Sequence, residues 1–159
     1  IAQSAQPIIS YNFGLGYKER VVATERIALL TSVVSGVVVM AAFSLFPHIL
    51  VGLFINPDNP AARIAIEGYP YFSAAFIFFI LNLTVIGYYQ SVERVKPATV
   101  LALLRGFIFL IPSFLLLPQA IGTNGIWLAL CLSEMLTTVV IIVMYGRATR
   151  KVCLQRRTE

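Results

Sequence analysis

Two charged residues, Arg105 and Glu134, stand inside long apolar stretches of the sequence, where a charge needs a partner, a hydrated cavity or a function. At a helical rise of about 1.5 Å per residue, Arg105 lies roughly 10 Å from one end of its stretch. Glu134 lies about 13 Å from the opposite end of its own stretch, near the middle of a bilayer core about 30 Å thick. A guanidinium side chain can close the remaining gap. Two interpretations follow: Glu134 titrates or binds a cation while Arg105 tunes it, or the two form a structural ion pair between neighbouring helices.

Neutral polar side chains form a second group of candidates. Asn82 and Thr84 lie near the middle of the apolar stretch Tyr69–Tyr89, where they must hydrogen-bond to a helix, a water or a substrate, and Gln90 follows directly. The chain has no Ser/His/Asp set, no closely spaced carboxylate pair and no Cys/His spacing typical of a metal site. The sequence therefore predicts neither an enzyme, nor a bound metal, nor an organic cofactor.

The composition identifies the environment of these residues. Hydrophobic residues make up 58% of the chain, charged residues only 12%, and the mean hydropathy is +0.85. Soluble domains carry about a quarter charged residues, so the chain is predicted to be an all-α, polytopic membrane bundle. The net charge of +5 does not indicate nucleic-acid binding, because the basic residues lie between apolar spans rather than on a soluble face.

Turn signals divide the chain into helices. The prediction is a partial helix and four complete spans, at residues 1–13, 27–55, 69–89, 98–117 and 126–145. Pro47 is expected to kink the first complete span, and Pro112 interrupts the third. Residues 1–146 are interpreted as part of a transmembrane lobe from a longer protein, and residues 147–159 as a basic tail.

The basic residues assign a side to each connection. Eleven of the twelve Lys and Arg residues fall on one side if the 14–26 loop, the 93–96 turn and the tail share it, which leaves Arg63 opposite. By the positive-inside rule this side is cytoplasmic. The expected location is the inner membrane, with a cytoplasmic C-terminus.

Several ordered motifs then point to a family. They are Gln6-Pro7 with Tyr11, Asn12 and Gly14; Gly87 with Gln90; Leu104-Arg105; and Gly125-Ile126-Trp127 with Glu134. Together they resemble the C-terminal lobe of the multidrug and toxic compound extrusion (MATE) family, from Ala5 to Tyr145. In that family's twelve-helix plan, the chain corresponds to the end of helix 8 and all of helices 9–12.

The resemblance implies an antiporter that exchanges Na⁺ or H⁺ for small cationic, amphipathic compounds. Its partners are the bilayer and the N-terminal lobe of the same chain, and the two lobes rock around a central cavity. Gln6, Tyr11 and Asn12 are expected to line or hinge the lobe near that cavity. Several members carry an acidic residue in helix 10, where this chain has Asn82 and Thr84. The candidate carboxylates are therefore Glu134 and those of the N-terminal lobe, which the family also uses. Two alternatives stay open: a flippase of lipid-linked oligosaccharides or polysaccharides from the same superfamily, and a membrane scaffold that transports nothing.

Overall fold

The computed structural model describes residues 1–56 and 58–155, with side chains through Tyr145, and this part of the chain is helical without any strand. This confirms the all-α prediction. The elements are α1 (Ala2–Gly14), α2 (Lys18–Leu45), α3 (Pro47–Gly52), α4 (Pro60–Ser73), α5 (Ala75–Ser91), α6 (Val95–Leu103), the π-helical turn η1 (Leu104–Ile108), α7 (Leu110–Ile121) and α8 (Thr123–Gln155).

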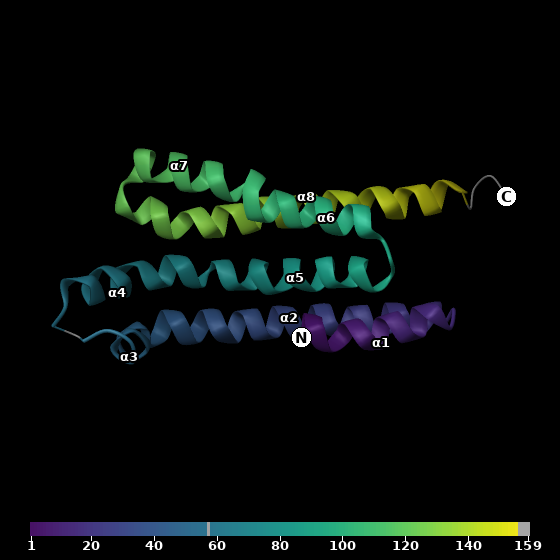
Figure 1. The fold of residues 1–159 in the computed structure, drawn as a ribbon, viewed down its shortest axis with the longest axis horizontal. Coiled ribbons are helices and arrows are strands. Elements are labelled where there is room, and N and C mark those ends of the chain that lie inside the picture. Colours follow the sequence, from purple (N-terminus) through teal and green to yellow (C-terminus); the bar gives the residue numbers. More distant parts are fainter. Residues whose placement is uncertain (57, 156–159) are drawn as a thin grey trace.

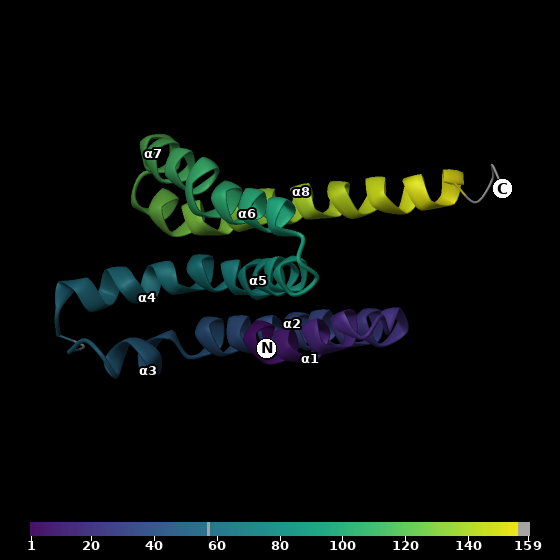
Figure 2. The same ribbon diagram turned by 45° about the vertical axis from the view of Figure 1, so that its right-hand side comes forward.

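The helices run back and forth along one long axis, with α4 and α5 between the α1–α2 hairpin and the α6–α8 segment (Figures 1 and 2). The α1–α2 turn, the α5–α6 turn and the end of α8 lie at one end of the bundle. The α3–α4 connection and the α7–α8 turn lie at the other end. Helix α5 is central, because it contacts α1, α2, α6 and α8.

Three helical segments are long and apolar enough to cross a membrane: α2, Val95–Ile121 and Thr123–Tyr145. The pair α4–α5 adds a fourth if it is counted as one span. The described part is thus a multi-pass helical bundle.

The interior of this bundle combines apolar side chains, such as Leu101, with small and polar ones. Ser32, Ser73, Ser133 and Thr137 are fully buried, whereas many large apolar side chains face outward. Small residues let membrane helices approach closely, and lipid covers the outward side chains. At Gly36, for example, an added Cβ would lie 2.7 Å from Ile77 Cα, so α2 and α5 nearly touch there.

Two of the predicted spans are broken helices. Span 27–55 is not continuous: α2 ends two residues before Pro47 and α3 begins at it, because proline lacks an amide hydrogen and its ring clashes with the preceding turn. Span 69–89 bends by 50° between α4 and α5. Near this bend Pro70 offers no amide hydrogen, and Ser73 Oγ donates to the Pro70 carbonyl oxygen at 2.8 Å.

The helices also start before the predicted span bounds at 27, 69, 98 and 126. Helix α4, for example, starts at Pro60, because Asn59 Oδ1 accepts a hydrogen bond from Ala61 N at 3.0 Å and proline suits the first helical position. The backbone of α8 continues into the predicted tail as far as Gln155, and residues 156–159 lie outside the described part.

Both turns at the α1–α2 end close with the same hydrogen-bond pattern. Tyr17 N donates to Asn12 O at 2.9 Å, and Arg94 N donates to Tyr89 O at 2.9 Å. Each pattern needs a residue with positive φ, which is Gly16 in the first turn and Glu93, at 57°, in the second. These tight turns hold α1 beside α2 and α5 beside α6.

Candidate functional site

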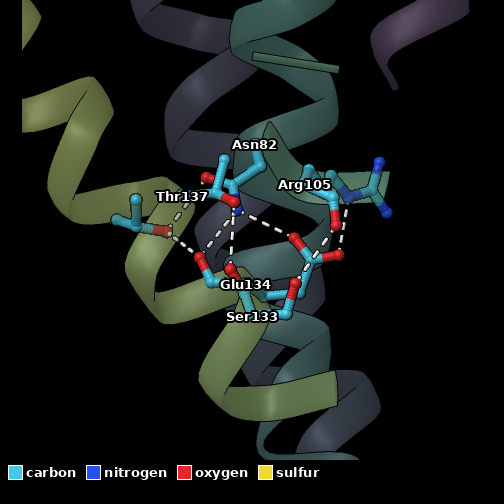
Figure 3. A network of polar contacts seen from close by, with 6 residues as sticks. Asn82, Arg105, Ser133, Glu134 and Thr137 are labelled. Atoms are coloured by element: carbon cyan, nitrogen blue, oxygen red, sulfur yellow. Dashed lines mark hydrogen bonds and ion pairs between the residues drawn. The ribbon is translucent and has the colours of Figure 1, made fainter. Parts of the chain in front are cut away.

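Glu134 of α8 is the centre of a buried polar network. Only 1% of the surface of this residue is exposed. Arg105 of η1 places Nε 2.6 Å from Glu134 Oε1, and its side chain is 16% exposed. Asn82 of α5, also fully buried, donates from Nδ2 to Glu134 Oε2 at 2.8 Å (Figure 3). Both carboxylate oxygens therefore have a donor, each from a different helix, and the ion pair expected from the depth of the two charges is formed.

The orientation of Asn82 is fixed by contacts on both sides of its amide. Its Nδ2 also donates to the backbone oxygen of Glu134 at 2.9 Å. Thr138 Oγ1 lies 2.9 Å from Asn82 Oδ1 and 3.0 Å from the same backbone oxygen of Glu134. Because Thr138 is one helical turn after Glu134, α8 presents both groups to α5.

The π-helical turn positions Arg105. Phe109 N donates to Leu104 O, five residues back, at 2.8 Å, rather than to Arg105 O, four residues back. The Arg105 carbonyl oxygen instead accepts a hydrogen bond from Ser133 Oγ at 3.1 Å (Figure 3). Pro112 explains the location of this irregularity, since it cannot donate to the Ile108 carbonyl and crowds the turn before it.

The far side of the Arg105 guanidinium faces a hollow. Its Cζ lies 4.3 Å from the centroid of the Phe79 ring, a cation–π contact. Its two terminal nitrogens point away from Glu134 (Figure 3), and within the described residues they make no hydrogen bond. The hollow measures about 360 Å³, and apart from Arg105 and Glu134 its lining is apolar or glycine.

Three other predicted residues meet at a second hollow of about 570 Å³ between α1 and α5. Gln6 Nε2 donates to Gln90 Oε1 at 3.0 Å, and Thr84 lines the same space. Thr84 Oγ1 also lies 2.6 Å from Ser32 Oγ of α2, so part of its role is to join two helices. Leu83 and Ile86 line both hollows, which are therefore neighbours on α5.

The last two predicted residues join neither group. Tyr11 is 69% exposed. Asn12 is buried, and its Nδ2 donates to Ile8 O at 2.8 Å within its own helix. No group of His, Cys, Asp or Glu in the described residues is arranged to hold a metal ion.

Sequence reasoning missed several contributors to the network. Thr138 could have been found by helical spacing, since it lies four residues after Glu134. Ser133 could not, because adjacent helical residues point in different directions. The contact of Phe79 with Arg105 could not be predicted from the sequence, because aromatic residues are common in apolar spans. The 2.5 Å hydrogen bond from Tyr145 to Glu25 Oε1 was also missed, although it joins α8 to α2.

A bundle of helices that are long and apolar enough to cross a membrane defines a polytopic membrane protein. The MatE family model matches residues 1–115, and the chain belongs to this family, whose members are transporters rather than enzymes. No curated protein and no solved structure matches the chain. Asn82 and Arg105 lie within the matched residues and Glu134 follows them, so its role must be argued from its contacts.

Proposed function

We propose that the chain forms the C-terminal lobe of a cation-coupled antiporter that exports cationic amphipathic compounds, with an N-terminal lobe completing a central cavity. The lobe lies in the inner membrane with its C-terminus in the cytoplasm, as the distribution of basic residues favours. Family membership supports transport. The observation that carries the coupling proposal is the burial of Glu134 between donors from α5 and η1.

Coupling would act through competition for the carboxylate. A proton or Na⁺ that reaches Glu134 weakens its attraction for Arg105 and frees the guanidinium. Because this pair joins η1 to α8, its loss weakens the link between the two elements at the π-helical turn and leaves the Ser133–Arg105 bond. Such turns are frequent at functional sites. A change in the charge of one residue thereby alters helix packing, which alternating access requires.

The hollow beside Gln6 and Gln90 is the proposed contact surface for substrate. Its amide groups supply hydrogen-bond donors and acceptors without a net charge, and the adjoining hollow adds apolar walls. This combination suits an amphipathic molecule. The Glu134–Arg105 pair is electrically balanced, so additional negative charge for a cationic substrate is expected from carboxylates of the N-terminal lobe.

The test is efflux of ethidium from cells that express the transporter with both lobes, with a Na⁺ gradient and a pH gradient imposed separately. The Glu134→Gln variant should lose efflux driven by the coupling ion while its membrane insertion is unchanged. Glu67→Gln is the matched control and should retain efflux, because within the described part Glu67 pairs with Arg63 and both side chains are exposed. Efflux by Glu134→Gln at the level of the unmodified protein would contradict a coupling role.

One observation favours a second candidate function. Within the described residues the terminal nitrogens of Arg105 make no hydrogen bond. They adjoin an apolar hollow and offer donors to an anion, which suits a flippase of lipid-linked oligosaccharides or polysaccharides. In that case neither gradient would drive ethidium efflux, and Arg105→Gln would abolish movement of the anionic lipid across the membrane.

A further inference from the structure

A separate hollow of about 330 Å³ lies at the end of the bundle where the α1–α2 and α5–α6 turns meet. Its charged lining residues are Lys18, the first residue of α2, and Arg94, the residue before α6. The other walls include Phe13, Val21 and Val92. The hollow therefore combines two cations with an apolar surface, at the end of membrane-spanning helices.

Neither cation forms an ion pair within the described part of the chain. Among the described residues, ion pairs form between Arg63 and Glu67 and between Arg105 and Glu134, and neither involves Lys18 or Arg94. Both residues are exposed, and their side chains make no hydrogen bond within the described part. Their charges are thus available to an anion from outside the chain.

Two helices begin beside this hollow. Helix α2 starts at Lys18 and α6 follows Arg94, and within the described part neither helix has a side-chain cap. The first two amides of α6 belong to Val95 and Lys96, which do not line the hollow, and the next residue, Pro97, has no amide hydrogen. The two cations and the apolar side chains, rather than the helix N-termini, therefore supply the attraction for an anionic lipid.

We propose that this basic hollow binds the phosphate of an anionic phospholipid, with an acyl chain along the exposed apolar side chains of Phe13 and Val22. The apolar wall favours a lipid over free phosphate, since a small inorganic anion gains nothing from it. The positive charge favours an anionic over a zwitterionic headgroup, whose own cation would be repelled. The site is independent of Glu134 and of the direction of transport.

The test is binding of lipid to the purified chain in non-ionic detergent, measured by native mass spectrometry. Dioleoyl phosphatidylglycerol should bind more tightly than dioleoyl phosphatidylcholine, which has the same acyl chains. Removing both cations in Lys18→Gln/Arg94→Gln should abolish most of this preference, at about fivefold in apparent affinity per cation. The matched control, Lys96→Gln/Arg63→Gln, removes two charges outside the hollow and should retain the preference.

Three outcomes would overturn the proposal. The unmodified chain could bind both lipids equally, or the control variant could lose as much affinity as the test variant, which would indicate general electrostatic attraction. Alternatively, inorganic phosphate could raise the melting temperature as much as phosphatidylglycerol does, which would indicate an anion site without a lipid. Two single variants provide a test that does not require the double variant to fold. Lys18→Gln should weaken the preference for phosphatidylglycerol over phosphatidylcholine, whereas Lys18→Arg, which retains the positive charge, should keep it.

Discussion

Replacing Arg105 by Met should strongly destabilise the bundle, because it leaves the Glu134 carboxylate buried without its cation. The carboxylate is 1% exposed and its Oε1 loses the donor at 2.6 Å, while Asn82 retains the bond to Oε2. Removing one partner of a buried ion pair costs about 3–5 kcal/mol. Since the carboxylate can escape part of this by taking up a proton, the expected loss is about 3 kcal/mol, or roughly a hundredfold in the unfolding equilibrium.

A double-mutant cycle separates the ion pair from the packing of the arginine stem. Glu134→Gln alone should cost about 1–2 kcal/mol, because Arg105 is partly exposed and keeps its contact with Phe79. The double variant Arg105→Met/Glu134→Gln has no buried charge, and replacing a whole buried pair is often nearly neutral, so it should lie within about 1 kcal/mol of the unmodified protein. The cycle should therefore give a coupling of at least about 2 kcal/mol.

Unfolding can be followed by the fluorescence of Trp127, the only tryptophan, during titration with sodium dodecyl sulfate in mixed micelles. Its ring lies against Phe72 of α4, with centroids 6.3 Å apart, so its emission reports separation of α8 from α4. Arg63→Met is the control: its ion pair with Glu67 has side chains 86% and 66% exposed, and its loss should cost no more than about 0.5 kcal/mol. Equal stability of Arg105→Met and Arg63→Met, or a double variant as unstable as Arg105→Met alone, would refute the reasoning.

Two further predictions use the same titration. Gly36→Ala should lower the free energy of unfolding by about 1–3 kcal/mol, because the new methyl group would overlap Ile77 Cα. The control is Gly52→Ala, which should leave stability unchanged because no atom lies within 4 Å of the added Cβ. Equal effects of the two substitutions would disprove the close approach of α2 and α5. Tyr145→Phe should lower the free energy of unfolding by about 1–3 kcal/mol, because it removes the hydrogen bond to Glu25 that joins α8 to α2. The control Tyr71→Phe, at an exposed position, should leave stability unchanged. Unchanged stability of Tyr145→Phe would contradict this assignment.

Part of the site could be predicted because charge and depth are readable from sequence. The scarcity of charge inside apolar spans made Arg105 and Glu134 conspicuous, and counting residues along each helix placed them at compatible depths. The depth of a residue in the membrane does not give the rotation of its helix about the helix axis. The sequence therefore could not show that Asn82, rather than Thr84, contacts the Glu134 carboxylate. The same limit applies to Gln6 and Gln90, which were named separately and meet only because α1 packs on α5.

The π-helical turn could not be predicted for a different reason. Pro112 marks an interruption of the span, but a proline can be accommodated by a kink, a break or a wider turn, and tertiary contacts select among them. Here the wider turn leaves the Arg105 carbonyl oxygen to Ser133 of the neighbouring helix. Pro47, in another predicted span, has no such partner described and breaks the helix instead.

The ion pair adds specific contacts to an interior that is partly polar and partly apolar. Lipid is as apolar as leucine, so these helices gain little from burying large side chains and depend on close packing and individual polar contacts. The described contacts among α5, η1 and α8 include the Glu134 carboxylate, and both of its oxygens are used. An apolar cluster that includes Val85, Leu101 and Ile141 also joins α5, α6 and α8. A change in the charge of Glu134 should therefore weaken the two polar contacts of its carboxylate, while this apolar cluster continues to hold the helices together.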